Sequence, residues 1–470
     1  MVFASLTFLA LFLPLSLVTY ALANTQGTRN ALLTAFSLLF YAWGEPVWIS
    51  LLLLSSLSDW TAALVIDRWR GRRAATVALV VSLALNLLLL GSFKYADLIT
   101  ATTNALTGLS LRSPGFSLPV GISFYTFQTI SYVVDVWRGD VRAQPRFDKF
   151  LLFVSLFHQL VAGPIVRYAD VAHDIDHRVV TRSGLLEGAS RFCVGLGKKV
   201  LLANVAGELV ARHLDGDLTA LPAAHAWFGL AMYTLQIYFD FSGYSDMAIG
   251  MGRMIGFHYL ENFDHPYAAR SVTDFWRRWH ISLGSFFRDY VYIPLGGKHR
   301  HPTRNLFVVW GLTGLWHGAS WNFVLWGLFH GALIALERLF VRRALERLPR
   351  ALQHAWLLLV VVVGWALFYF TDLHRLRLFF AAAAGLAPGP LAPEALATTL
   401  TTHATWLVVA ALLCTPLPGR AVDAARAALR QRRGVATDAV VTAVVDVLLL
   451  LLAVALLVGR TYNPFLYFRF

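Results

Sequence analysis

The stretch that decides the fold is GLWHGASWNFVLWGLFHG, residues 314–331. It is apolar enough to lie in a bilayer, yet it carries two histidines, three tryptophans, four glycines and Asn322. An ionisable side chain at membrane depth is costly and rare, so such a residue is a candidate for function by default. We therefore expect His317 to carry the chemistry of this protein.

The composition around this stretch predicts a membrane protein. The chain has 470 residues, of which 57% are hydrophobic and 14% charged, whereas a soluble domain carries roughly a quarter charged residues. Apolar runs recur along the chain with no long polar block between them. We expect one all-α polytopic membrane domain over residues 1–470, with N-terminal helices in 1–116, a core in 117–345 and C-terminal helices in 346–470.

Membrane spans are predicted from runs of about 20 apolar residues, and the candidates suggest about 11–13 transmembrane or re-entrant helices. Segment 223–256 is long, and we expect a break at Gly243 within FDFSGYSD. Residues 298–304 and 385–397 are rich in proline, glycine or charge and are predicted loops. Residues 419–436 alternate arginine with alanine, which predicts a basic amphipathic helix on the membrane surface.

The positive charge has a membrane explanation. The formal net charge is +13, which in a soluble domain would suggest nucleic-acid binding. Here the arginines cluster in short connections between apolar runs, as the positive-inside rule produces. We therefore expect contact with membrane lipid and no nucleic acid, with residues 68–73 and 138–146 on the cytoplasmic side.

Among the apolar segments, the one with the most polar residues lies between Tyr233 and Tyr267 and contains Asp240, Ser242 and Asp246. A carboxylate at bilayer depth needs a partner or water, and Arg253 is the nearest cation in sequence. Two readings stay open at this point. The carboxylates form an internal ion-pair network that fixes helix packing, or they line a wall where substrate binds.

The next segment, SVTDFWRRWHISLGSFFRDYVYIPLGG (271–297), mixes arginines with aromatic residues. Arginine offers forked donors that suit phosphate groups, so Arg277 and Arg278 are candidates to bind either coenzyme A or lipid headgroups. His280 follows Trp279 directly. A histidine beside tryptophan is more often a packed, hydrogen-bonded residue than a catalyst.

His317 has the best setting for proton transfer. It lies between Trp316 and Gly318, and a neutral, desolvated imidazole can take a proton from a hydroxyl as a general base. His330 is expected to be a packing residue. The chain has no His-Glu-x-x-His zinc motif, no Gly-x-Ser-x-Gly elbow and no Walker loop, and its two cysteines lack metal-ligand spacing, so we expect no metal site.

Several long motifs resemble the membrane-bound O-acyltransferase family, and within it the bacterial alginate O-acetyltransferase group. These motifs are LPVGISFYTFQTISYVVDVWRG (118–139), HQLVAGPIVRY (158–168), YFDFSGYSDMAIGMGRMIGF (238–257), NFDHPYAARSVTDFWRRWHISLGSFFRDYVYIPLGG (262–297), GLWHGASWNFVLWGLFHG (314–331) and NPFLYFRF (463–470).

The resemblance implies the following roles. His317 matches the family's catalytic histidine, and His280 matches its second polar residue. The helices would surround a central tunnel. The candidates to bind the donor or substrate would be Trp316, Asn322, Arg277, Arg278, Asp240, Ser242 and Asp246. No bound cofactor is implied, because the donor is a substrate, acetyl-CoA or another acyl thioester.

The resemblance also implies a partner and a place in the cell. The acetyl group would cross the bacterial inner membrane to a periplasmic SGNH-like acetyltransferase subunit, which modifies a secreted polysaccharide such as alginate. His317 would deprotonate the acceptor hydroxyl while His280 positions the thioester, although an acyl-histidine intermediate stays open. The competing interpretation is a transporter or flippase that uses His317, Asp240 and Asp246 as binding groups. A purely structural subunit would leave the clustered polar residues unexplained.

Overall fold

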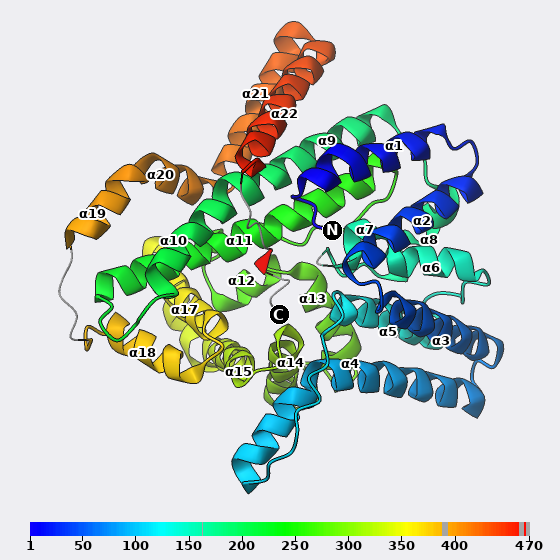
Figure 1. Ribbon diagram of the computed structural model, residues 1–470, viewed down its shortest axis with the longest axis horizontal. Coiled ribbons are helices and arrows are strands. Elements are labelled where there is room, and N and C mark those ends of the chain that lie inside the picture. Colours follow the sequence, from blue (N-terminus) through cyan, green and yellow to red (C-terminus); the bar gives the residue numbers. More distant parts are fainter. Residues whose placement is uncertain (162, 388–392, 460–464, 467–470) are drawn as a thin grey trace. The chain divides into compact units, whose positions relative to one another are not determined.

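The computed structural model describes residues 1–161, 163–387, 393–459 and 465–466, and these residues form helices and no strand (Figure 1). The chain divides into two compact units. The first comprises residues 1–196 and 244–261 with the described part of 454–469, and the second comprises 197–243 and 262–453. The all-α class expected from the sequence is confirmed.

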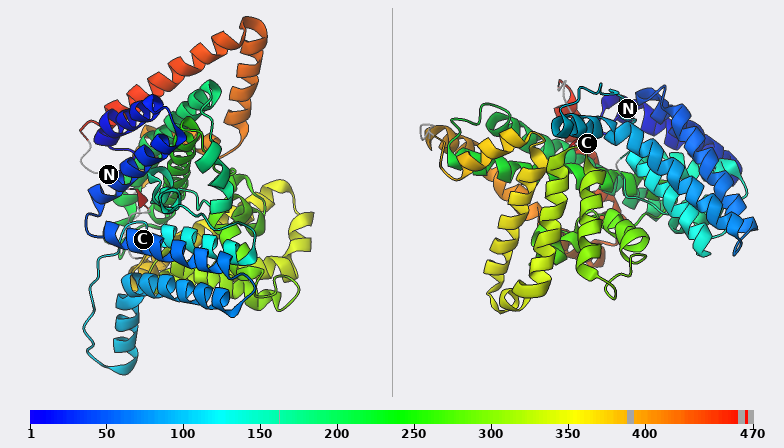
Figure 2. Two further views of the ribbon diagram at one scale, coloured as in Figure 1. Left: turned by 90° about the vertical axis from the view of Figure 1, so that its right-hand side faces the viewer. Right: turned by 90° about the horizontal axis from the view of Figure 1, so that it is seen from below.

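The first unit is built from helices of the N-terminal part of the chain. They are η1 (Phe8–Phe12), α1 (Leu13–Leu22), α2 (Gln26–Gly44), α3 (Ile49–Arg68), α4 (Arg73–Thr107), α5 (Ile122–Arg138), α6 (Phe147–Ser155), α7 (Phe157–Leu160), α8 (Tyr168–His177) and α9 (Arg182–Gly197). Helices α3, α4 and α5 pack against one another (Figures 1 and 2). Gly139 ends α5 in the left-handed conformation, with φ 88°, which glycine adopts without a steric penalty.

The second unit holds most of the remaining helices. They are η2 (Lys198–Ala203), α10 (Asn204–Leu214), η3 (Pro266–Ala268), α12 (Val272–Arg278), α13 (Ile281–Phe287), η4 (Arg288–Tyr292), α14 (Pro302–His317), α15 (Trp321–Leu336), η5 (Glu337–Val341), α16 (Arg342–Arg347), α17 (Arg350–Tyr369), α18 (Leu373–Ala383), α19 (Pro393–Thr402), α20 (Ala404–Leu413), α21 (Leu417–Arg433) and α22 (Val435–Leu457). Helix α11 (Ala223–Met254) contributes residues to both units.

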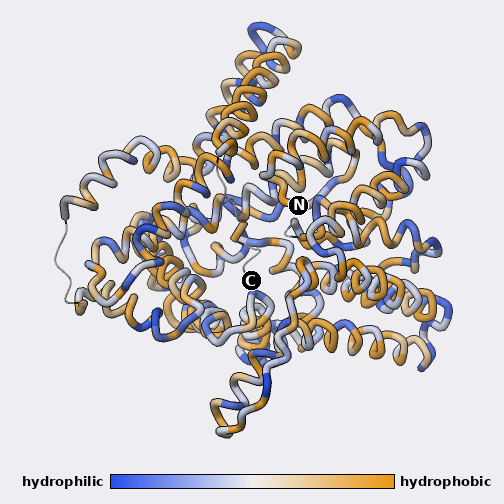
Figure 3. Tube along the Cα trace, in the orientation of Figure 1, coloured by the Kyte–Doolittle hydropathy of each residue, from blue (hydrophilic) through white to orange (hydrophobic). Residues whose placement is uncertain are grey.

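Several helices have the length and apolarity of membrane spans. Five described helices pass a test on both properties, at 49–68, 73–107, 321–347, 350–369 and 435–457, and the bent pair 395–402 with 404–413 would make a sixth. Figure 3 shows the apolar runs along α3 and α4 and the hydrophilic connection between them. Fewer helices pass than the sequence suggested. The 16-residue α14 is too short, whereas α11 has 32 residues but is not apolar enough. The multi-pass class is confirmed.

Three local expectations have different outcomes. The break at Gly243 is wrong, because α11 runs without interruption from Ala223 to Met254. The loop at 385–397 is wrong in its last part, since α19 begins at Pro393, while residues 388–392 lie outside the described residues. The basic helix expected at 419–436 is confirmed as α21, which buries none of its side chains.

Candidate active site

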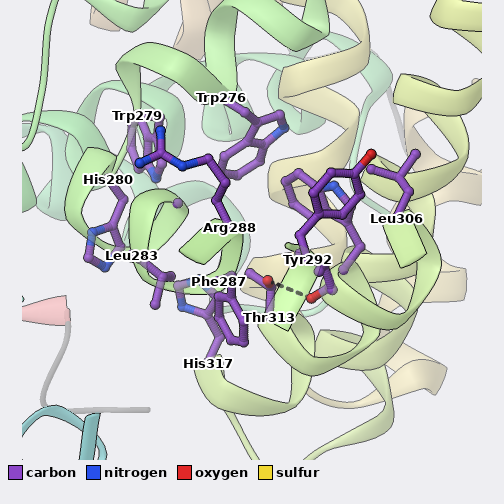
Figure 4. A pocket seen from close by; sticks show the side chains of 13 residues that line it. Trp276, Trp279, His280, Leu283, Phe287, Arg288, Tyr292, Leu306, Thr313 and His317 are labelled. Carbon is purple, nitrogen blue, oxygen red and sulfur yellow. Dashed lines mark hydrogen bonds between the residues drawn. The ribbon is translucent and has the colours of Figure 1, made fainter. Parts of the chain in front are cut away.

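The second unit contains a cavity of about 240 Å³ between α12, α13, η4 and α14. Its lining brings together two histidines and a largely apolar wall: Trp276, Trp279, His280, Leu283, Gly284, Phe287, Arg288, Tyr292, Leu306, Val309, Trp310, Thr313 and His317 (Figure 4). An apolar pocket with a few convergent polar groups is the usual form of a small-molecule site. We therefore place the candidate active site here.

His317 is the last residue of α14, a position that aims its ring at the end of the cavity. The helix begins at Pro302, which suits a first helical position because its missing N–H has no partner there anyway. The side chain of His317 is buried, and its ring lies 4.9 Å from that of Trp326 and 5.2 Å from that of Phe368, both measured between centroids. These aromatic neighbours hold the imidazole in a dry setting.

His280 joins α12 to α13 in the left-handed conformation, with φ 46° and ψ 54°. Residues other than glycine rarely adopt this conformation, although histidine does so more often than most. The ring is buried, and its centroid lies 6.5 Å from that of His317. Figure 4 shows the two imidazoles on the same wall, with Leu283 beside them. The two histidines singled out from the sequence therefore meet in one cavity.

A buried carboxylate fixes the start of the helix that leads to His280. Ser271 caps α12 by accepting the N–H of Asp274, in the usual manner of an N-cap serine. The carboxylate of Glu337 accepts the N–H of Val272 at 2.7 Å and that of Thr273 at 3.0 Å. An anion at a helix N-terminus also interacts favourably with the helix dipole. Glu337 therefore ties α12 to the end of α15.

Helices α14 and α15 approach closely because glycines face the neighbouring backbone. A side chain at Gly314 would overlap the carbonyl of Phe323, and one at Gly327 would overlap the carbonyl of Trp310. His330 also belongs to this packing, as expected: it accepts a hydrogen bond from the indole N–H of Trp276 at 3.3 Å. The glycines of the 314–331 stretch thus set the position of the helix that ends at His317.

The arginines chosen from the sequence do not line the cavity. Arg277 is exposed, and Arg278 pairs with Asp274 at 3.0 Å. The arginine that lines the cavity is Arg288, ten residues further on and paired with Asp289. Arg277 and Arg278 remain predictions as donor-binding residues, but the cavity gives them no contact.

Trp316 and Asn322 have roles in packing around the cavity. The ring of Trp316 lies 5.8 Å from that of His280 and 4.9 Å from that of His317. Asn322 is fully buried, and its amide donates to the carbonyl of Leu367 at 3.0 Å. Neither residue is part of the cavity lining. Trp316 supports both imidazoles, and Asn322 links α15 to α17.

The carboxylates of α11 have partners other than Arg253, so the expected pairing is wrong. Asp240 pairs with Lys199 at 2.6 Å, and both side chains are almost fully buried. Asp246 pairs with Arg191 at 2.9 Å, while Arg253 pairs with Glu187. Arg253 is the nearest cation in sequence, but it does not pair with either carboxylate. The partner of a buried charge depends on which side chains the neighbouring helices bring close to it. Ser242 is buried and is not among the lining residues.

A second cavity, of about 400 Å³, lies in the first unit. Its lining is polar, and Asp174 there accepts the backbone N–H of His258 at 3.0 Å. It shares no residue with the first cavity. Among the described residues, no group of three or more histidine, cysteine, aspartate or glutamate side chains is placed to hold a metal ion. The second cavity also contains histidines, but His173, His177 and His258 are exposed. His280 and His317 are buried, which makes the first cavity the better candidate for chemistry.

Sequence reasoning missed three residues that shape the site. Glu337, Arg288 and Asn262 were not among the predicted site residues. Asn262 is fully buried and contacts His280. Its position as the first residue of the 262–297 motif, which also contains His280, was the available signal.

Comparison with known proteins identifies the class to which this fold and site belong. The model of the MBOAT, membrane-bound O-acyltransferase family, matches residues 50–377. The chain belongs to this family, and it is a multi-pass membrane acyltransferase. This assignment favours the enzyme over the transporter among the alternatives open from the sequence.

Individual relatives agree with the family. The chain is 37% identical to a probable alginate O-acetylase AlgI of Azotobacter vinelandii over the whole of both chains. It is 42% identical to the probable alginate O-acetylase AlgI of Pseudomonas aeruginosa over 78% of this chain and 72% of that one. A peptidoglycan O-acetyltransferase of Helicobacter pylori is 33% identical over 77% of this chain and 75% of the relative.

Proposed function

We propose that this protein transfers an acetyl group from a thioester donor, acetyl-CoA or a similar acyl carrier, for the O-acetylation of a secreted polysaccharide. The observation that carries the proposal is the meeting of the buried His280 and His317 in one cavity, 6.5 Å apart between ring centroids. The acetyl-transfer reaction and the polysaccharide acceptor are supported by the names of the alginate and peptidoglycan relatives. Alginate or a related glycan is the acceptor that we propose.

The chemistry requires one base and one group that holds the thioester. His317 takes the proton of the attacking hydroxyl as its oxygen bonds to the acyl carbon, and the carbon–sulfur bond then breaks to release the thiol. The apolar wall keeps water away, which protects the thioester from hydrolysis and strengthens polar interactions inside the cavity. His280 lies close enough to contact the same small group.

We further propose that the acetyl group leaves on the periplasmic side of the bacterial inner membrane. There it would be taken up by an SGNH-like acetyltransferase subunit that modifies the polymer. The multi-pass helices support a membrane location for the reaction. Passage of the acetyl group across the membrane would combine a transfer reaction with a transport step.

The test is the replacement of His317 by alanine. The variant is expressed in a strain that lacks its own copy, and the O-acetyl content of the exported polysaccharide is measured at equal membrane abundance. We expect loss of nearly all acetylation, because the variant lacks the proposed base. His299→Ala, an exposed histidine outside the cavity, is the matched control. Normal acetylation by His317→Ala would refute the proposal.

Thioester consumption separates the enzyme from a transporter. The purified protein in vesicles is given acetyl-CoA with labelled acetyl groups, and the release of free coenzyme A is followed. The proposal expects release that depends on an acceptor and is lost in His317→Ala. Movement of a polar substrate without thioester cleavage would instead support transport.

A further inference from the structure

We infer that Asn262 is a positioning residue that fixes the tautomer of His280, so that the neutral ring presents Nε2 as a hydrogen-bond acceptor. The inference deepens the proposed function, on which its activity measurement rests. It gives His280 a defined chemical role, because an acceptor can hold a hydroxyl or N–H group of a substrate but cannot donate to a carbonyl. The contacts of the side-chain amide of Asn262 determine this role.

The side-chain oxygen of Asn262 has three close neighbours. It lies 3.2 Å from the backbone nitrogen of Ser282, 2.9 Å from the hydroxyl oxygen of Ser282 and 3.2 Å from Nδ1 of His280. One of them, the hydroxyl of Ser282, donates to this oxygen at 2.9 Å and lies further from Nδ1 of His280, at 3.5 Å. Asn262 is fully buried. Water therefore does not compete for these contacts.

The backbone N–H of Ser282 decides which end of the amide points at this group. A backbone N–H can only donate, so the atom facing it must be the amide oxygen and not the amide nitrogen. The assignment of the amide, which is otherwise a choice between two orientations, thus follows from a donor whose identity is certain.

The protonation of His280 follows from the orientation of the amide. An unprotonated Nδ1 would set its lone pair against the lone pairs of the Asn262 oxygen. A protonated Nδ1 donates to that oxygen, and a neutral imidazole has only one N–H. Nε2 is then the nitrogen that carries the lone pair, and the partner of one ring nitrogen sets the role of the other.

The backbone holds the ring in this arrangement. The carbonyl of Asn262 accepts the N–H of Ile281 at 3.0 Å, and the carbonyl of Arg278 accepts the N–H of Asp264 at 3.0 Å. These two bonds clamp the turn in which His280 has its left-handed conformation. An unfavourable backbone conformation persists only where the surroundings determine it. Asn262 supplies both the backbone and the side-chain contacts that do so.

Nuclear magnetic resonance tests the tautomer without any activity measurement. Protein labelled with ¹⁵N-histidine is compared with His280→Gln, and the signals lost in the variant belong to His280. We expect a protonated Nδ1 and an unprotonated Nε2 at neutral pH. A neutral His280 with the proton on Nε2 would overturn the inference.

The activity test uses Asn262→Asp, which keeps an acceptor oxygen and adds a negative charge next to Nδ1. A carboxylate near histidine favours the protonated ring, typically by about 1–3 pH units. Protonated His280 has no lone pair on Nε2, so the acidic limb of the pH–rate profile should move to higher pH by about that amount, with the alkaline plateau largely kept. Asn262→Ala should lower the rate at all pH values by about 10–100-fold, as is typical when the partner of a functional histidine is removed.

The control is Asn104→Asp, the same substitution at a surface residue of α4 whose side chain contacts Leu111. Its pH profile should match that of the unsubstituted protein. Superimposable profiles of Asn262→Asp and the unsubstituted protein, at equal abundance, would show that Asn262 only packs. If labelled His280 shows the expected tautomer while no variant or unsubstituted protein transfers acetyl groups, the proposed function fails and the tautomer assignment stands.

Discussion

The close approach of α14 and α15 gives a prediction about the placement of His317. A side chain at Gly327 would overlap the carbonyl oxygen of Trp310 and would lie 3.1 Å from the backbone nitrogen of Gly314. Ordinary contacts between non-bonded atoms are about 3.5 Å, so Gly327→Ala requires the helices to separate by about 1 Å. Gly314 lies one turn before His317, and the displacement reaches the imidazole.

Gly311→Ala is the matched control for this substitution. It changes the same residue type in the neighbouring helix, and a side chain there meets no atom within 4 Å. Replacing glycine by alanine within a helix stabilises it by about 1 kcal/mol at both sites. The comparison of the two variants therefore cancels helix propensity, and Gly327→Ala should be less stable than Gly311→Ala by the overpacking cost of about 1–3 kcal/mol.

The stability difference is measured from thermal unfolding of the purified proteins in detergent, followed by tryptophan fluorescence. The functional difference is measured as acetyl transfer from labelled donor at equal amounts of folded protein. A misplacement of about 1 Å can lower a rate by about 10²-fold, and we expect a loss of this order for Gly327→Ala only. Equal melting and equal transfer in the two variants would refute the claim that glycine contacts position His317.

Three further substitutions test the surroundings of the site. Glu337→Gln leaves one N–H at the start of α12 facing an amide NH₂ group, and should lower the free energy of unfolding by about 1–3 kcal/mol; unchanged melting would show that the cap is dispensable. Lys199→Ala leaves Asp240 buried without this cation and should lower the free energy of unfolding by about 3–5 kcal/mol. Replacing Lys199 by methionine and Asp240 by leucine together should recover most of the loss. A double variant no more stable than the single one would contradict this. His330→Gln should retain acetyl transfer within a few fold, as Trp276 is held mainly by packing; a loss as deep as that of His317→Ala would give His330 a catalytic role.

The class of fold and the two histidines could be predicted from the sequence because each leaves a local signal. Long apolar runs with arginines in the connections are sufficient to indicate a multi-pass helical protein. A histidine in an apolar stretch stands out against its neighbours, and His317 and His280 both line the cavity. His330 was predicted to be a packing residue, and it accepts a hydrogen bond from Trp276.

The partners of buried charges left no such signal. Asp240 lies 41 positions from Lys199 and 13 from Arg253 by residue number, yet it pairs with the more distant cation. Pairing is decided by which helix faces α11, and that depends on the packing of several helices at once. The break at Gly243 was predicted because segment 223–256 is long. It is wrong because α11 continues through Gly243, and the buried Asp240 within it is paired with Lys199.

His280 shows why the chemistry of a site is harder to predict than its members. The sequence indicated the residue but not its left-handed backbone, and the backbone conformation decides which way the ring points. The sequence also could not indicate that the side-chain oxygen of Asn262 contacts both Nδ1 of His280 and the backbone N–H of Ser282. Together these contacts change the expected role of His280. A neutral ring with its proton on Nδ1 would hold the proton-bearing part of a substrate. Polarisation of the carbonyl of the proposed thioester would then fall to another donor.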